Sequence, residues 1–182
     1  VVENPRHAAR AAAKLARAQR IVARRKRGSN SRKRAVALVA RHHARVRNQR
    51  IDHARKTAAW LVGKYDVIAH ENLNIAAMGR GMLAKGIHEA GWGILLHAIA
   101  CKAESAGKWD VGVDAPGTTR DCSGCGEPVP KGLGDRVHVC PRCGLVLCRD
   151  HNAAINIKAR GRRAVSELLA RAVLARSGLE AA

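Results

Sequence analysis

Cys122-Ser123-Gly124-Cys125-Gly126 and Cys140-Pro141-Arg142-Cys143-Gly144 are the two stretches that decide the local fold. Each Cys-x-x-Cys turn is tight enough to place two thiolates on one metal ion, and the glycine after each pair permits the backbone conformation that closes the turn. The 14 residues between the pairs are polar and glycine-rich, as expected of a ribbon loop. Four thiolates at this spacing predict a closed structural Zn²⁺ site with no open position for catalysis.

Two other interpretations of these cysteines are weaker. Two disulfides are disfavoured in a reducing compartment, and a redox motif is disfavoured because two such pairs face each other. Cys101 and Cys148 lie outside the pattern and are expected to be ordinary core or surface thiols.

The composition points to a polyanionic partner. The 182 residues include 34 Lys and Arg against 14 Asp and Glu, which gives a formal net charge of +20. Such an excess attracts nucleic acid or an anionic surface. Aromatic residues make up only 2% of the chain, so a single-strand binder built on stacked aromatic platforms is not expected.

The sequence also predicts a cytoplasmic protein with no membrane partner. No run approaches the roughly 18 apolar residues needed to span a bilayer, and the first residues lack the apolar core of a secretion signal.

The first third of the chain carries most of the charge and has helical spacing. Residues 1–60 hold 18 Lys and Arg and only two acids. Asn4 is expected to cap a first helix with Pro5 at its first position, and a tight turn over 28–31 precedes a second helix. The apolar stripe of the first helix is Ala8, Ala11, Leu15, Ala18 and Val22. The buried side of the second is expected at Ala35, Leu38, Val39, Val46, His53 and Trp60.

These two helices are expected to form a basic antiparallel hairpin that binds nucleic acid. The candidate contacts near its turn are Arg24, Arg25, Lys26, Arg27, Arg32, Lys33 and Arg34. A solvated charged face is the structural alternative, and an organelle transit peptide is another. Contact with about eight duplex phosphates would make log affinity fall with log salt at a slope near −7.

Residues 65–113 alternate between strand and helix patterns. Tyr65–Glu71 and Trp109–Val113 have strand character, and the stretch 88–106 between them carries apolar residues at helical spacing. This is a βαβ signature, in which Glu71 ends a strand. A glutamate at a strand end is commonly only solvated, and Asp150, where a later helix begins, has the alternative interpretation of an acidic N-cap.

The order of these features resembles the OrfB/TnpB proteins of insertion sequences, which are related to compact type V CRISPR nucleases. The resemblance runs from about Asn4 to Arg160, and its most specific parts are the four-cysteine ribbon and Arg149-Asp150-His151-Asn152-Ala153-Ala154-Ile155-Asn156-Ile157. It implies an α/β fold: an incomplete RuvC-like domain of the ribonuclease-H fold with a basic N-terminal helical hairpin and an inserted zinc ribbon. The implied parts are the hairpin at 1–64, a strand-helix-strand segment at 65–117, a ribbon that binds target nucleic acid at 118–147 and C-terminal helices at 148–182.

The resemblance also implies an activity, partners and a second metal. Family members cut DNA under the guidance of a transposon-encoded RNA, so DNA and a guide RNA are the implied partners, at the nucleoid in a prokaryotic cytoplasm. Glu71 and Asp150 become Mg²⁺ ligands by this resemblance. Hard carboxylate oxygens suit Mg²⁺, which readies a water and stabilises the leaving 3′ oxygen in phosphodiester hydrolysis.

The sequence departs from the family pattern at the first catalytic aspartate. In the family this residue lies on a strand upstream of the segment that resembles Asn4-Pro5-Arg6-His7. The only acids in residues 1–60 are Glu3 and Asp52, and neither is a credible substitute. His70 and Cys148 also depart from the usual pattern.

Two functions therefore remain open, together with the oligomeric state. The chain is either the C-terminal part of an RNA-guided, Mg²⁺-dependent DNA endonuclease of transposon origin, or a non-catalytic zinc-ribbon remnant that binds DNA or RNA. A zinc-ribbon regulator of transcription is a third hypothesis, and it leaves Glu71 and Asp150 unexplained.

Overall fold

The computed structural model describes residues 2–81, 84–132 and 134–176 and divides into two compact units. We call residues 1–63 with 74–102 the helical unit, and residues 64–73 with 103–182 the sheet unit. The described strands all belong to the sheet unit, so the chain combines a helical part with a mixed part.

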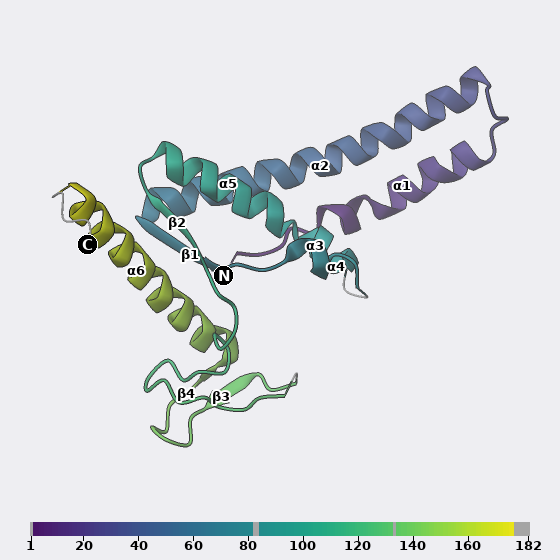
Figure 1. Cartoon of the computed structure of the whole chain (residues 1–182). Coiled ribbons are helices and arrows are strands. Elements are labelled where there is room, and N and C mark those ends of the chain that lie inside the picture. Colours follow the sequence, from purple (N-terminus) through teal and green to yellow (C-terminus); the bar gives the residue numbers. More distant parts are fainter. Residues whose placement is uncertain (1, 82–83, 133, 177–182) are drawn as a thin grey trace. The chain divides into compact units, whose positions relative to one another are not determined.

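Two long helices, α1 (His7–Ala23) and α2 (Asn30–Lys64), run antiparallel as the expected hairpin (Figure 1). The turn between them has the predicted glycine, Gly28, at a φ of 80°. The Ser29 hydroxyl accepts a hydrogen bond from the Arg32 backbone N–H at 3.2 Å and so caps α2. The predicted stripe of α1 is buried or half-buried throughout its length.

Two expectations about this hairpin are wrong. The first helix begins at His7 and not at Pro5, because the Asn4 side chain accepts from the Arg6 backbone N–H (2.9 Å) and Arg6 takes a left-handed φ of 50° ahead of the helix. Trp60 is 55% exposed. A seven-residue series drifts around an α-helix by about 20° per repeat, so its last member leaves the buried side. The fully buried residues in this part of α2 are Ala54, Ala58 and Val62.

Three shorter helices follow the first strand of the sheet unit. They are α3 (Ile75–Met78), α4 (Ala84–Ala90) and α5 (Trp92–Ser105). The Asn74 side chain caps α3, and Gly91 takes a φ of 66° between α4 and α5. α5 is the predicted core-facing helix, with Ile99 and Ala103 almost fully buried.

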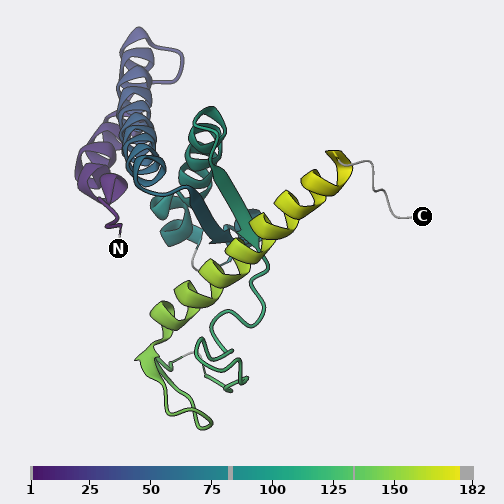
Figure 2. The same cartoon turned by 90° about the vertical axis from the view of Figure 1, so that its left-hand side faces the viewer.

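The main sheet is a parallel pair, β1 (Val67–Glu71) and β2 (Trp109–Val113), as the βαβ signature predicts. Val67 pairs with Trp109, and Glu71 pairs with Val113, so both strands end at the same edge. The long helix α6 (Arg149–Arg176) packs across both strands (Figure 2). Its buried Gly161 lies against Ala69 of β1.

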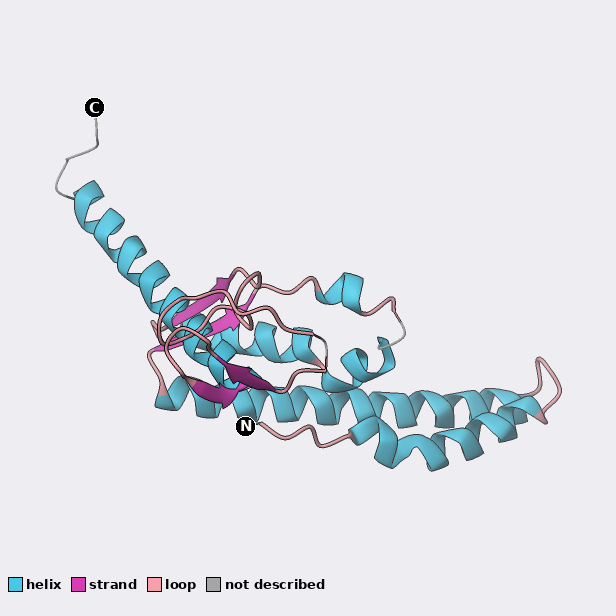
Figure 3. Cartoon of the chain, turned by 90° about the horizontal axis from the view of Figure 1, so that it is seen from below, coloured by secondary structure: helices cyan, strands magenta, loops and turns pink. Residues whose placement is uncertain are grey.

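The second pair of strands belongs to residues 122–148, which contain both Cys-x-x-Cys pairs and which we call the cysteine-rich segment. β3 (Val137–Val139) and β4 (Val146–Cys148) are antiparallel and three residues long each. Figure 3, coloured by secondary structure, shows that strands make up little of the chain beside its helices and loops. The core here is small and centres on Cys122, Val129 and Cys140. β4 runs directly into α6, which ties the cysteine-rich segment to the helix on the main sheet.

Candidate metal centre and carboxylate site

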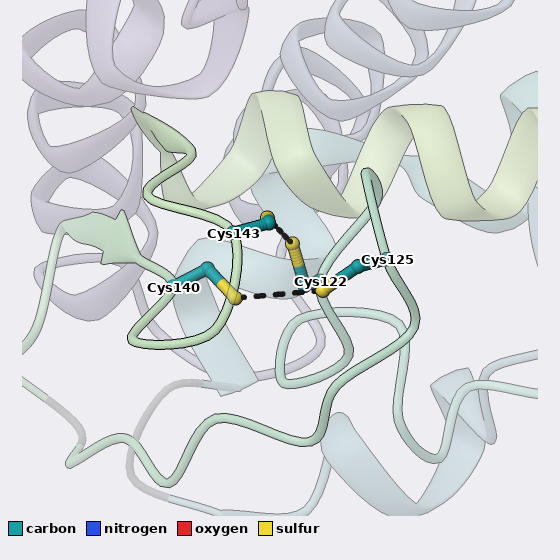
Figure 4. A group of neighbouring side chains, drawn as sticks. All are labelled: Cys122, Cys125, Cys140 and Cys143. Carbon is teal, nitrogen blue, oxygen red and sulfur yellow. Dashed lines mark hydrogen bonds between the residues drawn. The ribbon is translucent and has the colours of Figure 1, made fainter.

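The four paired cysteines converge on one point. The sulfurs of Cys122, Cys125, Cys140 and Cys143 all lie within 4.8 Å of one another. The Sγ atoms of Cys122 and Cys143 are 3.6 Å apart, as are those of Cys125 and Cys140, so each close pair joins the two Cys-x-x-Cys turns (Figure 4). Among the described residues, this is the one group of three or more side chains able to ligate a metal.

The backbone of each Cys-x-x-Cys turn is closed in the same way. The N–H of Gly126 donates to the Cys122 carbonyl at 2.8 Å, and the N–H of Gly144 donates to the Cys140 carbonyl at 3.0 Å. Both glycines take a positive φ, 78° and 73°. The predicted role of these glycines therefore matches their conformation, because other residues adopt it at a cost.

The spacing of the sulfurs fits a tetrahedral metal ion. Thiolates at about 2.3 Å from a zinc ion lie about 3.8 Å from one another, close to the 3.6 Å observed here. A disulfide would bring two sulfurs to about 2.05 Å. The four thiols are therefore arranged as a metal site, and Cys101 and Cys148 lie outside it.

One thiol is already favoured as a thiolate by its surroundings. The backbone N–H groups of Cys143 and Arg142 donate toward the Cys140 sulfur and lower the pKa of Cys140 to about 7. The pKa of Cys125 rises to about 12: the backbone N–H of Glu127 opposes this rise, but burial and the neighbouring thiols outweigh it.

A half-buried lysine and a buried histidine brace the cysteine-rich segment, and the sequence motifs pointed to neither. His138 on β3 is fully buried, and its Nδ1 meets the ammonium group of Lys131. The same ammonium group donates to the Thr119 carbonyl. The pair therefore joins the β3–β4 hairpin to the chain that enters the metal site. Neither residue follows a motif, so the sequence carried no signal for this contact.

Glu71 stands at the end of β1 and is held by a buried hydroxyl. Its Oε1 accepts a hydrogen bond from Thr118 Oγ1 at 2.5 Å, and Thr118 is only 1% exposed. Thr118 lies in residues 114–123, which lead from the end of β2 into the first cysteine pair. We call this segment the connecting loop. The contact fixes one carboxylate oxygen of Glu71 at the edge of the parallel pair.

His70, which departs from the family pattern, has partners on the sheet. Its Nδ1 lies 3.1 Å from the Glu71 carbonyl oxygen, and its Nε2 lies 3.4 Å from Asp110 Oδ1 on β2. Burial raises the pKa of Asp110, and His70 partly offsets the rise. The imidazole therefore lies beside the half-buried Asp110 carboxyl of the neighbouring strand, whose Oδ1 is 3.4 Å from His70 Nε2 without a hydrogen bond between them.

Asp150 occupies the first turn of α6 and is exposed to solvent. The helix begins one residue earlier, at Arg149, so Asp150 lies within the helix and not at its cap. A carboxylate in the first turn is stabilised by the helix dipole. Glu71 and Asp150 lie on two packed elements of one unit, and neither belongs to a group of three ligands within the residues that the structure describes.

Three side chains on one face of α6 bind the connecting loop. The Asn152 amide accepts from the Ser123 N–H (2.9 Å) and donates to the Asp121 carbonyl (2.8 Å). Four residues on, Asn156 donates to the carbonyls of Thr118 (2.9 Å) and Asp121 (2.8 Å).

Arg160, four residues further, continues the same face of α6. Its guanidinium donates to the carbonyls of Asp114 and Pro116 and lies 3.2 Å from Asp121 Oδ2. The spacing of four between positions 152, 156 and 160 can be read from the sequence. The loop groups that these side chains bind cannot.

The basic residues around the hairpin turn divide into two kinds. Arg32 is half-buried and donates to the Val22 carbonyl at 2.8 Å and the Arg25 carbonyl at 3.4 Å, so it braces the turn itself. The other six candidates expose their side chains, namely Arg24, Arg25, Lys26, Arg27, Lys33 and Arg34.

Comparisons with known proteins agree with this architecture. The family model described as "Probable transposase" matches residues 1–81, and that described as "Cas12f1-like, TNB domain" matches residues 92–157. A curated protein of Streptomyces pristinaespiralis, whose name is that of an RNA-guided DNA endonuclease, is 37% identical over 164 residues. Over these two matched segments the chain is similar to TnpB/Cas12f-like proteins.

The match to these TnpB/Cas12f-like proteins is partial in length. The alignment takes in 88% of this chain and 40% of the Streptomyces relative, so the chain spans well under half of that protein. The cryo-EM structure of a Cas12f1-sgRNA-target DNA complex has a similar fold, with a TM-score of 0.53 and 17% identity over 80% of this chain and 40% of that one. Within the described residues, no helix is both long and apolar enough to cross a bilayer.

Proposed function

We propose that this chain is a DNA-binding protein of transposon origin that provides part of an RNA-guided, RuvC-like DNA endonuclease. The observation that carries the proposal is the placement of Glu71 and α6. A buried hydroxyl holds Glu71 at the end of β1, and α6, with Asp150 in its first turn, packs on that same strand. In this proposal β1, β2 and α6 belong to a ribonuclease-H-like domain in a prokaryotic cytoplasm.

The proposed division of the chain assigns a role to each part. Residues 1–64 form a basic hairpin, residues 65–117 the strand-helix-strand part of the RuvC-like domain, and residues 148–182 its C-terminal helices. Residues 118–147 form a zinc ribbon that contacts target nucleic acid. The four thiols, all within 4.8 Å of one another, support zinc as a structural ion, because a four-thiolate site leaves no open position for substrate.

Glu71 and Asp150 are the proposed ligands of catalytic Mg²⁺. Bound there, Mg²⁺ would supply an activated water and stabilise the leaving oxygen during phosphodiester hydrolysis. The donor set suits this ion, because carboxylate oxygens are the ligands that Mg²⁺ prefers. Thr118 occupies one lone pair of the Glu71 carboxylate and leaves the others available to a cation.

The hairpin supplies the proposed grip on nucleic acid. Six exposed Lys and Arg side chains surround a turn that Arg32 keeps rigid. Phosphate contacts from such a surface position DNA or guide RNA without reading its sequence.

A non-catalytic zinc-ribbon binder is the second candidate function. It is favoured by one observation, that no group of three or more side chains in the described part of the chain includes Glu71 or Asp150. Binding would then be the activity of this chain.

A metal titration followed by NMR separates the two candidates. Mn²⁺, a paramagnetic substitute for Mg²⁺, is expected to broaden the amide signals of Glu71 and Asp150 in the zinc-loaded chain. Glu71→Gln and Asp150→Asn should abolish the effect, whereas Glu167→Gln, an exposed carboxylate of α6, should leave it unchanged. Broadening that does not reach Glu71 and Asp150, or that persists when they are substituted, would contradict the magnesium proposal and favour the non-catalytic function.

A further inference from the structure

Thr118 is a buried side chain whose hydroxyl is directed at the proposed Mg²⁺ ligand. It is 1% exposed and reaches Glu71, 47 residues away in the chain. The hydroxyl lies 2.5 Å from Glu71 Oε1 and 2.9 Å from the Ala115 carbonyl. A hydroxyl carries one proton, and the charged carboxylate is both the nearer and the stronger acceptor.

Glu71 needs such a partner because a glutamate side chain at a strand end is flexible unless a contact fixes it. A glutamate side chain has three rotatable bonds and loses considerable conformational entropy when it is fixed. One hydrogen bond from a buried donor restricts one carboxylate oxygen, while the remaining lone pairs stay open to a cation or water. The contact therefore orients the carboxylate without blocking it.

Thr118 is itself held from two directions. Its backbone N–H donates to the Ala115 carbonyl at 3.2 Å, which closes a turn, and its own carbonyl accepts from Asn156 of α6 at 2.9 Å. The preceding Gly117 takes a φ of 85°, and a Cβ there would overlap the Asp121 carboxylate. The backbone on which the hydroxyl is mounted is thus fixed to α6 and to its own turn.

We propose that Thr118 is a positioning residue that fixes the Glu71 carboxylate at the end of β1, and that Asn156 holds Thr118 in place from α6. The consequence for metal binding rests on the proposed function. The fixed orientation of Glu71 is independent of the proposed function, because it depends only on contacts within the sheet unit. The connecting loop is then a structural part of the carboxylate site as well as the entry to the cysteine-rich segment.

NMR of the Glu71 side chain in the zinc-loaded full chain tests this role. In the native protein, the Thr118 hydroxyl proton is expected to be protected from exchange with water and to show a cross-peak to the Glu71 side chain. The side-chain couplings of Glu71 should correspond to one rotamer. Thr118→Val keeps the shape and removes the donor, so the couplings should average toward those of a mobile glutamate. Thr118→Ser keeps the hydroxyl and should restore the single rotamer.

Each outcome decides the proposal. A single Glu71 rotamer in Thr118→Val, or averaged couplings in the native chain, would overturn it. Cross-strand signals between β1 and β2 report whether the variant is folded; if Thr118→Val unfolds, the hydroxyl cross-peak in the native chain and in Thr118→Ser still decides.

Mn²⁺ adds a separate readout. Thr118→Val should lower the affinity for Mn²⁺, measured by the broadening at Glu71, by about 10- to 100-fold, as is typical when a group that orients a metal ligand is lost. Thr118→Ser should recover the native affinity. If Mn²⁺ never reaches Glu71 in the native chain, the magnesium proposal fails, whereas the rotamer comparison still decides the positioning role.

Discussion

Gly161 is the residue that allows α6 to lie directly on the sheet. A Cβ at this position would overlap the Cβ of Ala69 on β1. Glycine in a helix interior is otherwise unfavourable by about 1 kcal/mol relative to alanine, so close packing is its physical justification here. The same contact sets how near Asn156 and Arg160 come to the connecting loop.

Gly161→Ala is therefore expected to destabilise the sheet unit by about 1–3 kcal/mol, the usual cost of overpacking. Gly63→Ala is the matched control, because Gly63 is also helical but an added Cβ meets nothing within 4 Å. That variant should stabilise the chain by about 0.5–1 kcal/mol through helix propensity alone. Urea unfolding measures both, and an equal response of the two glycines would contradict the packing argument.

At the scale of elements, α6 serves as the scaffold for the connecting loop. Its side chains at positions 152, 156 and 160 satisfy loop carbonyls that have left the sheet ladder. Buried carbonyls without a partner are costly, so these side chains stabilise an otherwise irregular segment.

Asn156→Ala should destabilise the sheet unit by about 1–3 kcal/mol, because the Thr118 carbonyl loses its amide donor. Lys158→Ala, on the exposed side of the same helix, should change stability by no more than about 0.5 kcal/mol. Chemical denaturation of the zinc-loaded proteins makes the comparison. An Asn156 variant as stable as the Lys158 variant would show that the loop does not depend on α6.

The hairpin makes a different prediction, about electrostatics. If the exposed residues at its turn contact phosphates, Arg27→Ala should lower affinity for unrelated DNA sequences equally and reduce the magnitude of the salt slope by about 1. The slope of the native chain is expected near −7 for about eight contacts. Fluorescence anisotropy at several salt concentrations measures both slopes, and an unchanged slope in Arg27→Ala would remove that residue from the interface.

Local patterns in the sequence predicted the elements better than the contacts between them. The Cys-x-x-Cys turns, the hairpin turn at Gly28 and the strand ending at Glu71 depend on nearby residues, and all three are present in the structure. The Thr118 hydroxyl is different, because its partner is 47 residues away and depends on where the connecting loop lies.

The two errors in the hairpin have different origins. Trp60 was expected to be buried by extending a seven-residue series, and Pro5 was expected to start a helix from its preferred position. The long series moved around the helix, and the Asn4 side chain formed a turn with Arg6 before the helix began. The first outcome follows from helix geometry, and the second from a side-chain turn that competes with the start of the helix.

At the scale of the whole molecule, the two units differ in what stabilises them. All four clustered thiols lie in the sheet unit, where Cys122, Cys125 and Cys140 form a small core together with Val129 and Leu145. The helical unit contains α1, α3 and α4 together with most of α2 and of α5, and it contains none of these thiols. Loss of the metal is therefore expected to act on one unit.

Cys125→Ser should lose the bound zinc and unfold the cysteine-rich segment, because a four-thiolate site supplies folding free energy to a segment with so little other core. Most of the helical circular dichroism should persist, since the long hairpin helices belong almost entirely to the helical unit, which contains none of the four thiols. Cys148→Ser, which removes a thiol outside the cluster, is the matched control and should retain one zinc ion per chain. Elemental analysis of zinc together with far-ultraviolet spectra measures both variants, and full zinc content in Cys125→Ser would refute the assignment of the ligands.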